Sequence, residues 1–317
     1  MKTLVFSTGG AYLTTMLGML DQLSERLEGA DSFAGISAGA IIAAFCATRP
    51  ISQAVTQLKS ILVEHIQDAI KPHYKYLNMP LSALFQKSIL NDSGLVSILK
   101  KELDGKPLLA TLYVGLTNET KMQYELHEFK PGVEPKGGLT VSQAVHGSSS
   151  VPVVFEGETT TDFHYSDGGV FHQIPVLAIK RMLEQASQEE NAALDLTIIS
   201  SSAWGYRPPE TECKLSYLAQ KTIHYLDCTN FNNLGSDREI LRECLSLFKP
   251  KVRVQFQMYS VPSQILRKLH SKFNIQQLVN ISMADIDHLL RLGKNIVLAD
   301  SATYSIDQDE PAPILKY

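Results

Sequence analysis

The stretch SFAGISAGAIIAAF, residues 32–45, sets a single serine, Ser37, between two glycines at a change of apolar pattern. SFAGI is short and apolar, as in a buried strand, whereas AGAIIAAF is apolar nearly all round, as in a buried helix. Packing a strand against a helix requires neither a hydroxyl nor two glycines at the junction. The pattern therefore predicts either a tight turn packed by small residues or a nucleophile held on a sharp elbow.

The residues before this stretch repeat the same order of elements. Residues 3–7, TLVFS, are a short apolar run followed by Gly9 and Gly10, and from Ala11 to Gly29 leucine and methionine recur at helical spacing. A strand, a helix, a strand and a helix at this spacing imply a parallel sheet with helices on both faces. Further strands are expected at residues 110–118, 122–129, 194–202 and 252–259, and helices over most of 51–103 and at 283–297.

Length and composition favour one soluble globular domain. The chain has 317 residues, 44% of them hydrophobic and 20% charged, and a formal net charge of −4. We find no repeat and no convincing linker, so a single domain is expected over residues 1–317, with the motifs in about residues 1–205, residues 206–317 packed on them, and a loose tail at 307–317. No block of lysine or arginine stands out, which argues against a nucleic-acid partner.

The cysteine pattern contains no C-x-x-C pair, which favours reduced thiols in a cytosol-like compartment over a disulfide framework. The four cysteines are Cys46, Cys213, Cys228 and Cys244. Cys228 with the nearby His224 could ligate a metal, but no second close pair completes a tetrahedral set. We therefore expect no metal and no cofactor.

The N-terminal residues look like a signal peptide only in part. STGG interrupts the apolar run MKTLVFSTGGAYLTTMLGML, and no small-residue cleavage site precedes a polar start. The longest clean apolar stretch, residues 40–47, is well short of the ~20 residues that a membrane-spanning helix needs. The protein is therefore predicted to be cytoplasmic or peripheral to a membrane, without a transmembrane segment.

A nucleophilic Ser37 would need a base and hydrogen-bond donors for the oxyanion. A histidine base, as in α/β-hydrolases, would require several strands before the elbow, and only one precedes Ser37. His270 and His288 lie in helical surroundings without a glycine-rich loop, so both are interpreted as structural. The base must then be sought elsewhere.

Two glycine-rich turns supply the other candidates. SDGG, residues 166–169, sets Asp167 on a tight turn where a carboxylate could act as base, although a plain β-turn gives the same pattern. STGG should bring the N–H groups of Gly9 and Gly10 to the same sheet edge as Ser37. A phosphate-binding loop would also carry such glycines, but no Gly-Lys-Ser/Thr sequence follows them.

Taken in order, the motifs resemble those of the patatin-like phospholipases, which use a Ser-Asp dyad. The resemblance covers about residues 3–180 and is carried by GGAYLTTMLGMLDQL (9–23), GISAG (35–39), QAVHGSSSVPVVFEG (143–157) and SDGGVFHQIPVLAI (166–179). It implies a three-layer α/β/α patatin-like fold with a mostly parallel central sheet. It also implies ester cleavage through an acyl-enzyme, with no metal required.

The same resemblance implies a role for each motif residue. Ser37 would be the nucleophile and Asp167 its proton acceptor, in a site dry enough to raise the carboxylate's pKa above its ordinary value of about 3.9. The amides of Gly9 and Gly10 would form the oxyanion hole. The elbow and the aspartate turn would depend on small residues at Gly35, Gly39, Gly168 and Gly169.

The chain departs from the family pattern in two places. Tyr12-Leu13 stand where the family has a basic residue and glycine, which keeps the backbone donors but removes anchoring by the basic side chain. His172-Gln173 stand where the family often has an Asn pair after Asp-Gly-Gly.

The implied function is that of a lipid acyl hydrolase, phospholipase A-like, acting on phospholipids or acylglycerols at a membrane or micelle surface. Residues 70–86 mix lysines with tyrosines, leucines and phenylalanine, and are interpreted as either an interfacial lid or a helical cap on the core. One alternative function is a catalytically weakened lipid-binding protein on the same scaffold, motivated by Tyr12-Leu13. The other is an acyltransferase that passes the acyl group to an alcohol.

Overall fold

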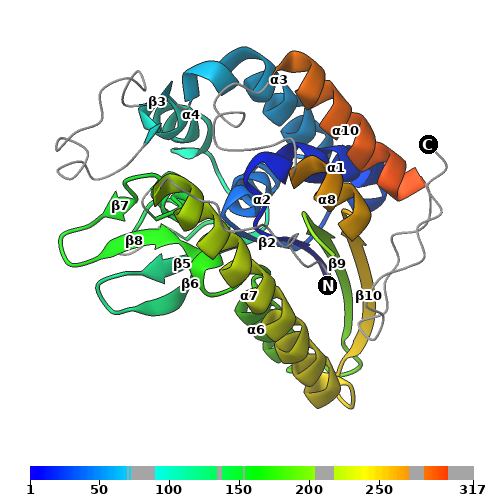
Figure 1. Cartoon of the computed structure of the whole chain (residues 1–317). Coiled ribbons are helices and arrows are strands. Elements are labelled where there is room, and N and C mark those ends of the chain that lie inside the picture. Colours follow the sequence, from blue (N-terminus) through cyan, green and yellow to red (C-terminus); the bar gives the residue numbers. More distant parts are fainter. Residues whose placement is uncertain are drawn as a thin grey trace.

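The apolar runs predicted as strands pair into one sheet at the centre of the protein (Figure 1). The computed structural model describes residues 1–69, 71–72, 90–133, 138–152, 154–203, 218–270 and 282–298. Within these residues the sheet consists of β1 (Lys2–Phe6), β2 (Ser32–Ile36), β5 (Thr111–Asn118), β6 (Gln123–Phe129), β7 (Glu158–Thr159), β8 (His164–Asp167), β9 (Ala193–Ser200) and β10 (Arg253–Ser260). A separate short pair is formed by β3 (Lys71–Pro72) and β4 (Leu90–Asn91).

The central sheet is mostly parallel, as the alternation of strands and helices predicts. Its strands lie in the order β10-β9-β1-β2-β5-β8-β7, and β6 also pairs with β5. Neighbours from β10 to β5 are parallel, whereas β6, β8 and β7 join antiparallel beyond β5. Because parallel strands bring their carboxyl ends to one edge, the turns after β1 and β2 lie side by side there.

Helices cover both faces of this sheet and complete three layers (Figure 1). Side chains of β1 alternate between the two cores: Leu4 and Phe6 pack on one face, and Val5 packs on the other. The first core includes residues of α1 and α2, and the second includes residues of α6 and α7. The described helices are α1 (Leu13–Leu27), α2 (Ala38–Thr48), α3 (Ile51–Ala69), α4 (Ser93–Leu103), α5 (Val141–Ser149), α6 (Val176–Ala186), α7 (Leu218–Phe248), α8 (Ser263–His270) and α10 (Met283–Leu298), with 3-10 turns η1 (Gly10–Tyr12) and η3 (Gly168–Val170).

The helix predicted at residues 283–297 is α10, and it packs on α1 with the two backbones almost in contact. A Cβ atom on Gly18 would lie 2.2 Å from the carbonyl oxygen of Leu290, and one on Gly293 would lie 2.1 Å from that of Thr15. Neither backbone atom can move aside without shifting its helix, so both positions require glycine. The apolar face of α10 is thereby buried against the N-terminal half of the chain.

Candidate active site

Ser37 lies on the turn between β2 and α2, in a backbone conformation that few residues adopt. Its φ is 57° and its ψ is −130°. Such a conformation costs roughly 1–3 kcal/mol and persists only where neighbouring groups hold it. Here the Ser37 amide donates to Ser148 Oγ at 3.0 Å, and that hydroxyl donates to the Gly115 carbonyl at 2.6 Å. The serine therefore stands on an elbow that is fixed from α5 and β5.

The two glycines of Gly-x-Ser-x-Gly are required by close backbone approach. A Cβ atom on Gly35 would lie 2.3 Å from the Gly39 carbonyl oxygen. A Cβ atom on Gly39 would lie 2.3 Å from the carbonyl oxygen of Ser7, just past the end of β1. Gly35 therefore lets the first turn of α2 pack closely on β2, and Gly39 lets the same turn pack on the end of β1.

The register of the sheet brings Asp167 to the serine, 130 positions away in the chain. Ile36 at the end of β2 pairs with Gly115 of β5, and the next β5 residue, Leu116, pairs with Asp167 of β8. The Ser37 hydroxyl forms a hydrogen bond with the Asp167 carboxylate. Both residues are almost fully buried, with 6% and 4% of their surfaces exposed.

Burial is the main influence on the Asp167 carboxyl group. It raises the pKa of Asp167 to about 7, although the hydrogen bonds from the Ser37 hydroxyl and the Gly169 amide act in the opposite direction. The Gly169 amide donates to Oδ1 at 2.7 Å, which fixes the orientation of the carboxylate. A group with this pKa can both accept and release a proton near neutral pH.

The two glycines after Asp167 each serve a different contact. A Cβ atom on Gly168 would lie 2.5 Å from the Gly115 carbonyl oxygen, so this glycine lets the turn approach β5. A Cβ atom on Gly169 would lie 2.9 Å from both Asp167 Oδ1 and Thr8 Cγ2. The aspartate turn and the loop after β1 are therefore in contact.

The loop after β1 carries the candidate oxyanion donors, Gly9 and Gly10. Its shape is set by a 3-10 bond from the Tyr12 amide to the Gly9 carbonyl at 2.8 Å, and by a positive φ of 49° at Gly10. Within the described parts of the chain, neither glycine amide donates a hydrogen bond. Both remain available to an oxygen atom of a ligand. The helix predicted from Ala11 therefore begins as η1 and becomes α1 only at Leu13.

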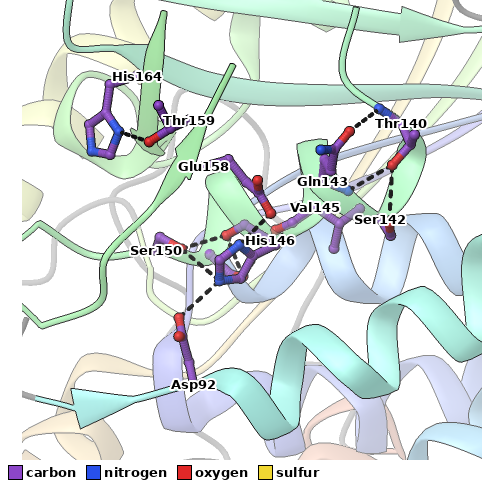
Figure 2. A network of polar contacts seen from close by, with 11 residues as sticks. Asp92, Thr140, Ser142, Gln143, Val145, His146, Ser150, Glu158, Thr159 and His164 are labelled. Carbon is purple, nitrogen blue, oxygen red and sulfur yellow. Dashed lines mark hydrogen bonds and ion pairs between the residues drawn. The ribbon is translucent and has the colours of Figure 1, made fainter. Parts of the chain in front are cut away.

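A second polar network, which the sequence pattern did not single out, supports α5 (Figure 2). His146 lies between Asp92, 2.9 Å from its Nε2, and Glu158, 2.8 Å from its Nδ1. Burial lowers the pKa of His146, but the two carboxylate hydrogen bonds outweigh it and raise the value to about 9. From the same end of α5, the Ser150 carbonyl accepts from the Asp167 amide at 2.9 Å. The network therefore fixes the helix end that contacts the aspartate.

Helix α7 holds the segment that follows the aspartate turn, another contact without a local sequence signal. Asp237 is fully buried and accepts from His172 Nδ1 at 2.6 Å and from the amides of Gln173 and Ile174 at 2.6 and 2.9 Å. Asn233 Nδ2 donates to the Val170 carbonyl oxygen at 2.8 Å. The residues that replace the family's Asn pair are thus tied to a helix about 60 positions later.

Several other predicted features lie apart from this site or outside the described residues. Cys46 and Cys244 are buried free thiols, and in the described residues no three His, Cys, Asp or Glu side chains gather in a way that could hold a metal ion. Cys213, the tail at 307–317 and all but residues 71–72 of the proposed lid lie outside the described residues, as do the side chains of His224, Cys228 and His270. Among the described helices, none combines the length and apolar character needed to cross a membrane.

The fold is a three-layer α/β/α arrangement, and at one edge of its sheet two buried residues, Ser37 and Asp167, lie together. The model of the patatin-like phospholipase family matches residues 4–179, more than half of the chain, and the chain belongs to this family. Membership supports lipid acyl hydrolysis in general. VipD from Legionella pneumophila, a solved structure, is similar with 16% identity and a TM-score of 0.42 over 95% of this chain and 67% of VipD. A comparison with curated proteins gave no match.

Proposed function

We propose that the protein is a serine esterase that cleaves carboxylic esters of phospholipids or acylglycerols through a Ser37-Asp167 dyad. The observation that carries the proposal is the hydrogen bond between the Ser37 hydroxyl and a buried Asp167 whose pKa is raised to about 7. Such a carboxylate is a stronger base than an exposed one, and general-base help of this kind is worth roughly 10²–10⁴ in rate. Family membership supports the lipid ester as substrate.

In the acylation step, Ser37 Oγ attacks the ester carbonyl carbon while its proton passes to the Asp167 carboxylate. The carbonyl oxygen becomes an oxyanion, which the amides of Gly9 and Gly10 stabilise. Removal of one such donor costs about 10²–10³ in rate in other serine hydrolases. When the tetrahedral intermediate collapses, the bond to the alcohol oxygen breaks, and the proton on Asp167 passes to that leaving oxygen.

In the deacylation step, a water molecule takes the place of the alcohol. Asp167 accepts a proton from the water as its oxygen attacks the acyl carbon, and returns that proton to Ser37 Oγ when the fatty acid leaves. The residues of the dyad need no metal for either step. The protein would act from the cytoplasm or as a peripheral enzyme, on lipid presented at a membrane or micelle surface.

The direct test is hydrolysis of a lipid panel by the wild type, with the Ser37→Ala variant as the blank. Phosphatidylcholine, monoacylglycerol and triacylglycerol in mixed micelles should release free fatty acid in at least one case, and Ser37→Ala should release none. Release by both proteins alike would overturn the proposal. Transfer of the acyl chain to an added alcohol without release of free fatty acid would show that the protein is an acyltransferase and not a hydrolase.

A further inference from the structure

The peptide group that joins Thr8 to Gly9 is held from behind by two buried hydroxyl groups. The Thr8 carbonyl accepts from Ser7 Oγ at 2.7 Å and from Ser201 Oγ at 2.6 Å. Ser7 and Ser201 are 1% and 7% exposed, and the Ser201 amide donates to Ser7 Oγ at 2.9 Å. Both lone pairs of this carbonyl oxygen are thereby occupied, so the carbonyl direction is fixed.

A fixed Thr8 carbonyl also fixes the direction of the Gly9 amide. A peptide group is planar and trans, so its C=O and N–H bonds point in opposite directions. With the carbonyl turned toward Ser7 and Ser201, the Gly9 N–H must point away from them. A Cβ atom on Gly9 would lie 2.7 Å from Met16 Cε and 3.4 Å from Ser201 Cβ, so glycine also permits this close packing.

Gln173 holds the same loop from the other side and ties it to the aspartate turn. Its carbonyl accepts from the Thr8 amide at 2.8 Å, and its side-chain Oε1 accepts from Thr8 Oγ1. Its Nε2 donates to the Gly169 carbonyl at 2.9 Å. One buried side chain, 5% exposed, therefore connects the loop of Gly9 to the turn that orients Asp167.

We propose that Ser201 and Gln173 are positioning residues that aim the Gly9 amide at the oxyanion and keep it in register with Asp167. The proposal rests on the proposed function, because it concerns the oxyanion donor of the same site. An amide aimed in advance needs no reorientation when the oxyanion forms, which is the condition under which such a donor lowers the barrier. Neither residue touches the reacting atoms.

The test compares Ser201→Ala with a matched control, Ser200→Ala. Ser200 is also buried, but its hydroxyl donates to the Ser202 carbonyl at 2.8 Å and accepts from the Ser202 amide at 3.3 Å, and Thr8 is not among its hydrogen-bond partners in the described residues. On a soluble ester, Ser201→Ala should lower kcat by about tenfold with KM unchanged, since Ser7 still holds the carbonyl and a fully lost donor costs about 10²–10³. Ser200→Ala should leave both constants within about twofold.

Two further measurements separate positioning from a merely structural role. A trifluoromethyl ketone adds to Ser37 as a hemiketal oxyanion, so its Ki should rise by the same factor as kcat falls. The pH dependence of kcat/KM should not change, because Asp167 keeps its own contacts. Thr8→Val removes the hydroxyl that contacts Gln173 at constant volume, and should lower kcat by a few fold in the same manner, even if Ser201→Ala does not fold.

The outcomes for the inference and for the proposed function can be told apart. Folding of each variant is checked by its thermal midpoint. If Ser37→Ala and Asp167→Asn are inactive while Ser201→Ala and Thr8→Val match Ser200→Ala, the positioning role is wrong and the dyad stands. If Ser37→Ala retains the activity of the wild type, the proposed function itself fails. If Ser201→Ala loses activity through a higher KM, or if its pH dependence of kcat/KM is shifted, the positioning role is also wrong.

Discussion

Two residues of the candidate site oppose the stability of the fold. Ser37 has a φ of 57°, and Asp167 is a carboxyl group with only 4% of its surface exposed. A strained backbone and a buried ionisable group both reduce the free energy of unfolding, and such features concentrate at functional sites. Their position side by side is therefore more easily explained by chemistry than by packing.

The raised pKa of Asp167 predicts how activity depends on pH. The carboxylate must be ionised to accept the serine proton, so kcat/KM for a soluble ester should be low in acid and rise with an apparent pKa of about 7. The profile is measured from pH 5 to 9 with a neutral substrate. A rise centred near pH 4 would contradict the account, because it would describe an unperturbed carboxyl group.

The same shift predicts that Asp167→Asn stabilises the protein while abolishing turnover. Folded Asp167 keeps its proton up to about pH 7, whereas the ordinary pKa of an aspartate side chain is 3.8, so the wild type loses stability as pH rises between these values. At pH 8 the free energy of unfolding of the neutral variant should exceed that of the wild type by up to about 4 kcal/mol, at 1.36 kcal/mol per pKa unit.

Urea denaturation at pH 8 and at pH 4 measures this difference. Near pH 4 both side chains are largely neutral in the folded state, so the advantage of the variant should almost disappear. An equal advantage at both pH values would mean that Asp167 is not the titrating group.

At the scale of elements, the elbow depends on how closely α2 approaches the end of β1. In Gly39→Ala the new methyl group would lie 2.3 Å from the Ser7 carbonyl oxygen, and that backbone atom cannot move alone. We expect a loss of stability of at least the ~1–3 kcal/mol typical of overpacking, together with loss of activity.

Gly235→Ala is the control for this substitution. Gly235 lies on α7 with no atom within 4 Å of the added methyl group, so the change should be neutral or stabilising by up to about 1 kcal/mol. Thermal midpoints of both variants decide the matter. Equal midpoints would show that the close approach at Gly39 is not required.

The His146 network joins α4, α5 and β7, and it should make stability depend on pH above neutrality. The pKa of His146 is raised from 6.5 to about 9 by Asp92 and Glu158 despite its burial. Its contribution, about 3 kcal/mol at 1.36 kcal/mol per pKa unit, is therefore complete below pH 6.5 and lost as pH rises through 9.

His146→Gln tests this contribution because it cannot carry the charge. The wild type should be more stable than the variant at pH 6.5, and most of the difference should vanish by pH 10. Denaturation curves at both pH values provide the measurement. A difference that stays constant with pH would assign the network a packing role only.

In the molecule as a whole, the features that could be predicted from the sequence are those set by residues close together in the chain. The strand before Ser37, the helix after it and the parallel sheet follow from apolar runs and glycines within a few positions of one another. Gly35 and Gly39 could be predicted as turn residues for the same reason. The hydrogen bond between Ser37 and Asp167 could be expected only from the order of the family's motifs.

Contacts between distant segments could not be predicted in this way. Ser201 meets Thr8 across 193 positions, and Asp237 meets Gln173 across 64. Ser201 lies near the end of the strand predicted at residues 194–202, and Asp237 lies in a polar stretch, and neither context indicates a distant partner. Ser201 meets Thr8 only because β9 pairs with β1 in the folded sheet. Asp237 meets Gln173 only because α7 packs over the aspartate turn. The contact of Ser148 with the Ser37 amide could not be predicted either, because Ser148 is one of three consecutive serines.

Reaction of the folded protein with a fluorophosphonate in detergent micelles reports on the reactivity of Ser37 itself, because the reagent reacts far faster with an activated serine than with an ordinary hydroxyl group. Peptide mapping by mass spectrometry should place the phosphonyl group on Ser37 of the wild type. The rate should rise with an apparent pKa of about 7. Labelling should be absent in Ser37→Ala and greatly slowed in Asp167→Asn. If the wild type remains unlabelled, or if Asp167→Asn is labelled as fast as the wild type, Ser37 and Asp167 do not act as a catalytic dyad.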